Sequence, residues 1–250
     1  MKYFSRILAT VGVLSCSLSM SMQTASASPI NGTLQLGGTF TIGPTFLNFC
    51  PAPGPCPTAP GPWNSPATGT GDLSAYTGDG MITNLSSGTE PVGTLLPGNG
   101  IPFLVFTGGV SVGGGSNPDT PTIEFFITEV FAGVGTAANC ASGGEGTLCT
   151  PTGSAVTLLN GSGGNSSATI TAAGLAENLT TGEFDALQIV LTSQFNTTYE
   201  SVLNTEATFG SITNTFSATF TATSAPEPSS MWMIGIGAGL VLFAARRHKQ

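Results

Sequence analysis

The stretch "TFSATFTAT", residues 215–223, indicates the fold of this 250-residue chain. Apolar and hydroxyl side chains alternate along it, so that Phe216, Ala218, Phe220 and Ala222 share one face while serine and threonine occupy the other. Successive side chains of a strand point to opposite faces of a sheet. A period of two therefore predicts a half-buried β-strand with its polar side towards solvent.

The same pattern recurs elsewhere in the chain. The stretches "TLQLGGTFTI" (33–42) and "ALQIVLTSQF" (186–195) also alternate. The stretches "IPFLVFTGGVSV" (101–112) and "TIEFFITEVF" (122–131) are apolar on both faces, which is typical of central strands. These patterns predict a β-rich body.

We expect a single all-β domain over residues 28–225, built as an antiparallel β-sandwich or jelly roll. Short turn sequences such as Asn99-Gly100 favour antiparallel neighbours. A parallel β-helix is the alternative, although the chain shows no repeat of fixed period. One short helix is expected to interrupt the strands near residues 172–179.

The body has no cationic side chain. All five basic residues and the only histidine lie outside it, at Lys2, Arg6, Arg246, Arg247, His248 and Lys249. Twelve carboxylates lie within it and give it a formal charge of −12, against −8 for the whole chain. Each carboxylate must therefore be solvated, accept hydrogen bonds or bind an external cation.

This composition excludes several classes of function. Nucleic-acid binding requires lysine or arginine to neutralise phosphates, so we expect no nucleic-acid partner. A Ser-His-Asp or Cys-His site needs a histidine, and so does a histidine-ligated metal. A phosphate-binding Walker loop needs a lysine. The side chains that remain for catalysis are carboxylates, hydroxyls and amides.

Four cysteines of the body form two local pairs. Cys50 and Cys56 bracket "PAPGP", and Cys140 and Cys149 bracket "ASGGEGTL". An even number of cysteines in an exported chain indicates disulfides, and four cysteines allow three connectivities. We favour Cys50–Cys56 and Cys140–Cys149 because the partners are close in sequence.

A carboxylate-based glycoside hydrolase is the common enzyme design that this composition allows. Glu124 and Glu129 are the nearest candidates, but residues five apart on a regular strand point to opposite faces unless a bulge intervenes. Glu183 and Asp185 share a face by parity. No residue is assigned as catalytic.

Two kinds of ligand are considered for the same body. We expect no obligatory cofactor, and calcium is the candidate ion, with Asp72, Asp79 and Asp119 in oxygen-rich loops as its candidate ligands. For a carbohydrate, the candidate stacking residues are aromatic, and core packing is their alternative use: Trp63, Tyr76 and Tyr199.

The N-terminal segment predicts export. Two basic residues precede an apolar stretch, and Ala25-Ser26-Ala27 has the small residues of a cleavage site. Residues 1–27 are therefore expected to be a signal peptide that engages the secretion translocon and is then removed.

The segment "APEPSSMWMIGIGAGLVLFAARRHKQ" (225–250) combines three ordered parts. Pro226-Glu227-Pro228 comes first, residues 231–245 form an uncharged apolar run, and residues 246–250 are basic. The run is short for a membrane-spanning helix, at about 22 Å against a hydrocarbon core of about 30 Å. Arg246 and Arg247 are expected to hold its end in the cytoplasm, so that the body lies outside.

This order of parts closely resembles the PEP-CTERM sorting signal of Gram-negative bacterial surface proteins. The resemblance covers residues 226–250 and implies a membrane protease of the exosortase type as a partner. It further implies cleavage near Pro226-Glu227-Pro228, after a transient stay in the inner membrane, and delivery to the cell surface or outside the cell. An ordinary anchor that is never cut is the alternative.

The preferred interpretation is a non-enzymatic protein of the envelope or of an exopolysaccharide or biofilm matrix, with extracellular polysaccharide as a candidate partner. A carbohydrate-binding or adhesive module, with or without calcium, is the second interpretation. A carboxylate-based glycoside hydrolase is the third.

Overall fold

A computed structural model describes residues 29–50, 61–62, 67–78, 80–106, 109–110 and 115–223, with the side chains of residues 50, 61–62 and 109–110 left out. The predicted signal peptide (1–27) and sorting segment (226–250) lie outside these residues. Within the described part, no helix is long and apolar enough to cross a membrane.

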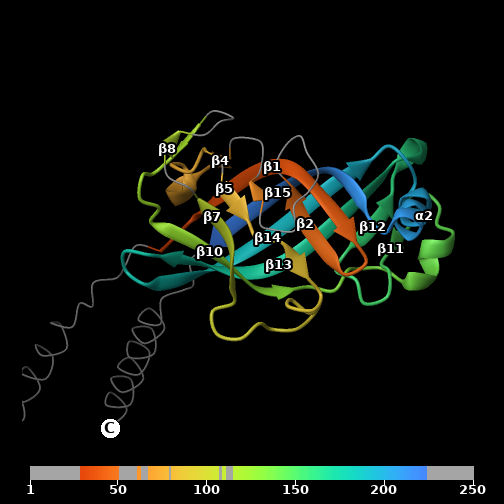
Figure 1. Ribbon diagram of the computed structural model, residues 1–250, viewed down its shortest axis with the longest axis horizontal. Coiled ribbons are helices and arrows are strands. Elements are labelled where there is room, and N and C mark those ends of the chain that lie inside the picture. The colour runs from red at the N-terminus through yellow and green to blue at the C-terminus, as the bar shows by residue number, and fades with distance from the viewer. Residues whose placement is uncertain are drawn as a thin grey trace, which may run out of the picture.

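The described chain is mostly antiparallel β-structure (Figure 1). Its long strands are β1 (Gly32–Gly43), β10 (Ile123–Val130), β13 (Ser166–Asn178), β14 (Glu183–Phe195) and β15 (Ile212–Thr223). Its shorter strands are β2 (Phe46–Cys50), β3 (Gly61–Pro62), β4 (Thr68–Gly69), β5 (Gly80–Ile82), β6 (Leu85–Ser86), β7 (Ile101–Phe106), β8 (Gly109–Val110), β9 (Ser116–Asn117), β11 (Leu148–Cys149) and β12 (Thr157–Asn160).

One sheet contains thirteen of these strands, in the order β3-β5-β7-β10-β13-β14-β15-β1-β2-β6, with β4, β11 and β12 attached at its side. The other two, β8 and β9, form a small sheet of their own. The helical elements are α2 (Tyr199–Phe209) and three 3-10 turns, η1 (Gly71–Leu73), η2 (Ala137–Ala141) and η3 (Ser162–Gly164). The prediction of antiparallel β-structure is confirmed.

The alternating stretches form strands as predicted. Along β15 the apolar residues Phe216, Ala218, Phe220 and Ala222 are buried, and the hydroxyl residues between them are half-buried or exposed. β1 and β14 follow the same rule. β7 and β10 both have neighbours on either side, which confirms them as internal strands. The period-two pattern thus fixes which face of each strand meets the core.

The prediction of a helix near residues 172–179 is wrong. These residues belong mainly to β13, which pairs with β10 on one side and with β14 on the other. The local run of alanine and leucine suits a helix, but Ala172, Gly174 and Ala176 alternate on the buried face. Pairing on both edges and burial of one face outweigh the intrinsic propensity of a short segment.

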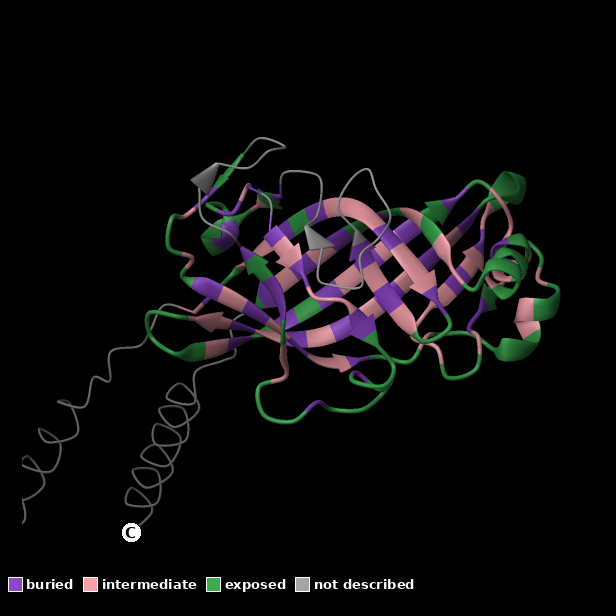
Figure 2. Ribbon diagram, viewed as in Figure 1, coloured by how far each residue is buried: buried purple, intermediate pink, exposed green. Residues whose placement is uncertain are grey.

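The main sheet curls around one aromatic core instead of splitting into two separate sheets. The Phe220 ring on β15 lies 6.1 Å from that of Phe103 on β7 and 6.0 Å from that of Phe125 on β10. Strands β13 and β14 separate β10 from β15 in the sheet, so the two rings meet only because the sheet bends inward. Figure 2 shows buried positions alternating with half-buried or exposed ones along the long strands.

A second, smaller core closes one end of the sheet. Helix α2 buries Tyr199 and Val202 against Cys149, Leu158 and neighbouring apolar residues. The helix ends at Gly210, whose φ of 79° is a left-handed conformation that favours glycine. This second core holds residues 131–156 against the sheet and shapes the pockets at this end of the molecule.

Removing the Phe220 ring should destabilise the whole domain. Phe220 is fully buried between two walls of the sheet, so Phe220→Ala should lower the free energy of unfolding by about 3–5 kcal/mol in urea unfolding followed by circular dichroism. Phe209→Ala is the matched control, because Phe209 is 77% exposed and should change stability by less than about 0.5 kcal/mol. Equal effects of the two changes would contradict the proposed core.

Candidate functional sites

The described domain begins and ends at the same end of the sheet. Gly32 of β1 pairs with Ala222 of β15, one residue before the strand ends at Thr223. The predicted cleavage residues Ala25 and Ala27, and the sorting residues Pro226, Glu227, Pro228, Arg246 and Arg247, lie outside the described residues. The two ends of the described domain, before β1 and after β15, therefore lie close together (Figure 1).

Carboxylates fasten the first described residues to the sheet. The Ile30 N–H donates to Asp185 Oδ2 at 2.6 Å, and the Asn31 N–H donates to Asp72 Oδ2 at 2.8 Å. Asp185 is buried on β14, whereas Glu183 is exposed at the start of the same strand. Asp185 and Asp72 therefore hold the domain's N-terminal strand in place.

The calcium candidates do not come together as a site in the described chain. Asp72 is engaged with the Asn31 backbone, Asp119 lies in an exposed bend, and Asp79 is outside the described residues. No group of three or more histidine, cysteine, aspartate or glutamate residues within the described ranges could hold a metal ion.

Glu124 and Glu129, the nearest candidates for a carboxylate pair, lie far apart. A β-bulge between Ile127 and Glu129 shifts the register of β10 against β13. Glu124 then faces Glu177 and Glu129 faces Ala173, so both glutamates point outward, on the same face. Their register partners are four residues apart on β13, which separates the two glutamates by about 13 Å. This exceeds the roughly 9.5 Å limit for a glycosidase pair.

The structure brings Glu124 together with a different carboxylate, Glu177. They are direct register partners on β10 and β13 and lie on the outer face of the sheet. Burial raises the pKa of Glu124, and repulsion from Glu177 raises it further. Phe126 and Phe184 meet edge to face beside this pair, with ring centres 6.2 Å apart. Sequence spacing could not predict the Glu124–Glu177 pair, because it depends on strand register.

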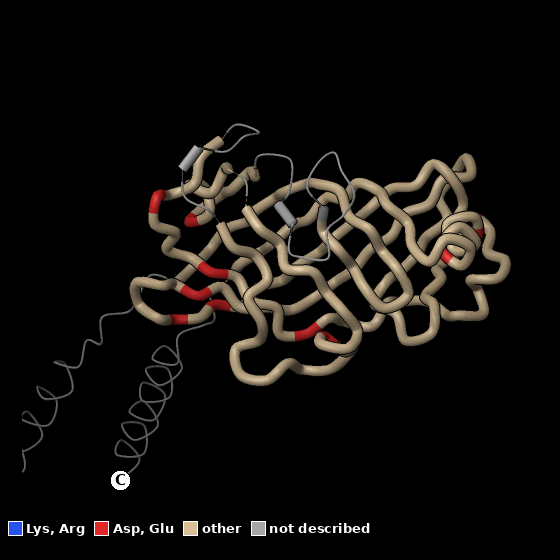
Figure 3. Tube along the Cα trace, viewed as in Figure 1, with Lys and Arg blue, Asp and Glu red and all other residues tan. Residues whose placement is uncertain are grey.

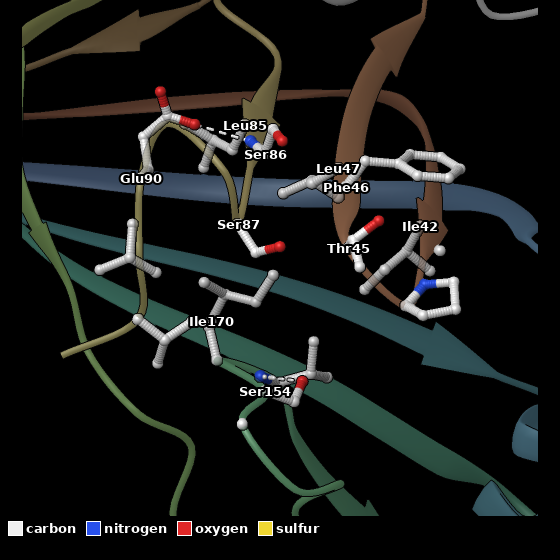
Figure 4. Close-up of a pocket in the computed structure, with 17 residues that line it drawn as sticks. Ile42, Thr45, Phe46, Leu47, Leu85, Ser86, Ser87, Glu90, Ser154 and Ile170 are labelled. Carbon is white, nitrogen blue, oxygen red and sulfur yellow. Dashed lines mark hydrogen bonds between the residues drawn. The ribbon is translucent and has the colours of Figure 1, made fainter. Parts of the chain in front are cut away.

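A pocket of about 80 Å³ opens between the β1–β2 turn and the segment that follows β11 (Figure 4). Its walls are mostly apolar, and Ser87 and Ser154 contribute hydroxyl groups. Glu90 is buried and lines the pocket, and its carboxylate accepts a hydrogen bond from the Ser86 N–H at 2.6 Å. The pocket can take a small, largely apolar group.

A second pocket of about 150 Å³ shares the β1–β2 turn and Val156 with the first. Helix α2 contributes Val202, Leu203 and Glu206 to its wall. Burial raises the pKa of Glu206. Each of these two pockets contains one carboxylate, so neither provides the two carboxylates that hydrolysis of a glycosidic bond requires.

The disulfide between Cys140 and Cys149 is present, in the pairing that the sequence favoured, with Cα atoms 5.0 Å apart. The Cys50–Cys56 pair stays a prediction, because residue 56 lies outside the described chain. The closed loop is bound to helix α2, where the Gly143 N–H donates to Glu200 Oε1 at 2.8 Å.

Glu200 is the centre of this attachment. Asn160 Nδ2 donates to both Glu200 oxygens, at 3.3 and 3.1 Å, and Asn160 Oδ1 accepts from the Tyr199 N–H at 2.9 Å. Although burial opposes ionisation, the hydrogen bonds from Gly143 and Asn160 lower the pKa of Glu200 from its ordinary value of 4.5 to about 2. The carboxylate thus joins the disulfide loop, β12 and α2.

The described tyrosines serve the core and not an open binding face. Tyr76 is buried, and its hydroxyl accepts hydrogen bonds from the backbone N–H groups of Thr122 and Ile123 at 3.0 Å. Tyr199 is buried, and its hydroxyl donates to the Asn139 carbonyl at 2.9 Å. Trp63 lies outside the described residues.

Comparison with protein-family models matches residues 224–248 to the PEP-CTERM protein-sorting motif. No curated protein and no solved structure matches the chain. The resemblance noted at Pro226-Glu227-Pro228 is thereby confirmed. The match begins at the residue that follows the end of β15, so the sorting motif is joined directly to the sheet.

Neutralising Glu200 should loosen the disulfide loop. Because the pKa of Glu200 is lower in the folded protein than in the unfolded chain, its ionised form stabilises the fold above about pH 4.5, and this stabilisation is lost as the pH falls towards 2. Glu200→Gln should lower the free energy of unfolding by about 1 kcal/mol at pH 7, allowing for solvent screening. The difference from the unmodified protein should shrink below pH 4.5.

Urea unfolding over a range of pH values would measure this effect. Glu145→Gln is the control, since Glu145 is an exposed carboxylate of the same loop. A pH-independent difference between Glu200→Gln and the unmodified protein would contradict the role of the ionised carboxylate.

Removing the negative charge of Glu177 should remove its electrostatic repulsion of Glu124. Like charges directly opposite on neighbouring strands are destabilising, so Glu177→Gln should raise the free energy of unfolding at pH 7 by about 0.5 kcal/mol. It should also lower the pKa of Glu124, which carbon-detected NMR titration can follow. The gain should vanish at low pH, where both carboxyl groups are protonated. A similar gain from Glu183→Gln, opposite Asn178, would indicate a general charge effect instead.

Proposed function

We propose that this protein, whose residues 224–248 are a PEP-CTERM sorting motif, is a non-enzymatic structural component of the bacterial envelope or of its extracellular matrix. The motif indicates an exported protein that an exosortase sorts. The proposal includes the structural role, the Gram-negative host, the transient stay in the inner membrane and the position of the cut.

The observation that carries the proposal is the direct connection between the sorting motif and the folded domain. β15 ends at Thr223, and Pro226 follows three residues later. Three residues span at most about 11 Å. A cut near Pro226-Glu227-Pro228 would therefore release the complete sheet and leave only a short extension on its last strand. The sorted product would be the whole β-domain.

Composition and geometry support a structural role over catalysis. The body has no lysine, arginine or histidine, and the two pockets described above hold one carboxylate each. Glu124 and Glu177 lie together on the outer face of the sheet, which is not enclosed. Catalysis requires a site that contacts the transition state more strongly than the substrate, and an open face offers few such contacts. The rows of serine and threonine on the outer face of β13, β14 and β15 also suit a matrix component.

The mass of the surface-associated protein tests the sorting proposal. Cleavage after Ala27 and near Pro226-Glu227-Pro228 should give a chain that starts at Ser28 and lacks the basic tail. Replacing the three motif residues by alanine (Pro226→Ala, Glu227→Ala, Pro228→Ala) should abolish the C-terminal cut and leave the protein with the membrane fraction. Pro121→Ala, in a loop of the domain, is the control.

Intact-mass spectrometry of the membrane and surface fractions measures both ends in one experiment. A surface-associated chain that still ends at Gln250 would overturn the sorting proposal. Normal trimming of the motif variant would overturn the assignment of the motif residues.

A further inference from the structure

The outward faces of β1, β13, β14 and β15 lie side by side and share a region rich in serine and threonine, with Glu177 of β13 towards one end. Their outward residues alternate with the buried ones and are half-buried or exposed. We call this surface the hydroxyl face and define it by residues that are all serine, threonine or glutamine: Thr33, Gln35, Ser167, Thr169, Thr171, Gln188, Thr192, Thr215, Ser217, Thr219 and Thr221.

Strand register arranges these side chains in rows. Ser217 on β15, Thr192 on β14 and Thr169 on β13 are successive register partners and make one row of hydroxyl groups across three strands. Gln35 and Thr219 begin a parallel row that reaches Thr171 through Val190. Neighbours in a row are about 4.8 Å apart, and rows repeat about every 7 Å along the strands. The result is a regular lattice of donors and acceptors.

Charged residues are confined to the borders of this lattice. Glu129 on β10 adjoins it at Ala173, Glu124 and Glu177 face each other across β10 and β13, and Glu200 lies on α2. Figure 3 shows most of the Asp and Glu positions towards the two ends of the molecule. A well-solvated surface usually has roughly a quarter to a third of its residues charged. When every outward position is counted in the three rows that contain Ser217, Thr219 and Thr221, none on β1, β15, β14 or β13 is charged. Solubility alone therefore does not explain these rows.

We propose that the hydroxyl face binds a neutral polysaccharide chain. This deepens the proposed function, on whose extracellular location it rests, by naming the class of partner. The surface offers uncharged donors and acceptors in a repeating pattern, which complements a polymer of repeating hydroxyl groups. An anionic polymer would be repelled by the formal charge of −12 on the body.

Two further features favour this partner over a folded protein. Interfaces between proteins have an apolar centre, but in the three rows that contain Ser217, Thr219 and Thr221 the apolar side chains of β1, β15, β14 and β13 are limited to Val190 and Ala173. Threonine is β-branched, so rotation about its first side-chain torsion is already restricted. The side chains of the hydroxyl face therefore lose little conformational entropy when a polymer binds. Repetition along the polymer then allows many weak contacts to add.

Affinity electrophoresis and pull-down of the full-length chain in mild detergent test the proposal. The neutral probes are dextran, soluble starch and microcrystalline cellulose, and alginate is the anionic probe. The triple variant Thr169→Val, Thr192→Val, Ser217→Ala removes one row of hydroxyl groups but keeps side-chain shape. The control triple variant Thr94→Val, Thr120→Val, Ser201→Ala removes the same groups from exposed positions elsewhere.

The unmodified protein and the control should bind at least one neutral probe and not alginate. The row variant should lose affinity at least tenfold, as expected for the loss of several hydrogen bonds, while unfolding at the same temperature. No binding to any neutral probe, equal binding to alginate, or full binding by the row variant would overturn the proposal. Self-association that the row variant abolishes would also overturn it, since the partner would then be a second copy.

The outcomes separate this inference from the sorting proposal. A chain that is trimmed and delivered but binds no neutral polysaccharide would contradict only the role of the hydroxyl face. A chain that binds but is never trimmed would contradict only the sorting.

Discussion

The fold depends on a chain of aromatic contacts that runs through the curled sheet. Phe216 contacts Phe49 at 5.3 Å, Phe49 contacts Phe103 at 5.9 Å, Phe103 contacts Phe220 at 6.1 Å, and Phe220 contacts Phe125 at 6.0 Å. Three of these pairs are edge to face and the Phe103–Phe220 pair is tilted, and such aromatic pairs add roughly 0.5–1.5 kcal/mol each beyond the area they bury. Because the pairs join strands that are not neighbours in the sheet, they require the sheet to bend. The inner face is thereby closed, and the hydroxyl side chains face solvent.

The absence of cationic side chains from the body sets a second constraint, which the fold meets with backbone N–H groups. Asp185 accepts from Ile30, Asp72 from Asn31, Glu90 from Ser86 and Glu200 from Gly143. Each carboxylate therefore fixes a segment of backbone instead of pairing with a lysine or arginine. Hydrogen bonds to charged groups are worth more than neutral ones, so a few such contacts can hold loops that ion pairs hold in other proteins.

Much of this architecture could be predicted from residue patterns, because burial of one strand face leaves a period of two in the sequence. The curl could not, since it arises from contacts between distant strands such as β15 and β7. The bulge at Ile127 to Glu129 changed which carboxylates meet, and only register shows that Glu124 faces Glu177. Helix α2 was missed because its few apolar residues meet a small local core. Its signals were Glu200 near its start and Gly210 at its end.

The sorting motif and the hydroxyl face are connected through β15. This strand supplies Thr215, Ser217, Thr219 and Thr221 to the face, and the motif begins at the residue after its end. From Thr223 to the apolar run at residue 231 the chain spans at most about 28 Å. If that run lies in a membrane before the cut, as proposed, the end of the sheet near Thr223 is held close to the membrane surface, and Glu124 and Glu177 lie near the same end of the sheet. A polymer would have least access there. Removal of the motif would free the whole length of the face, so that sorting and exposure of the binding surface become one event.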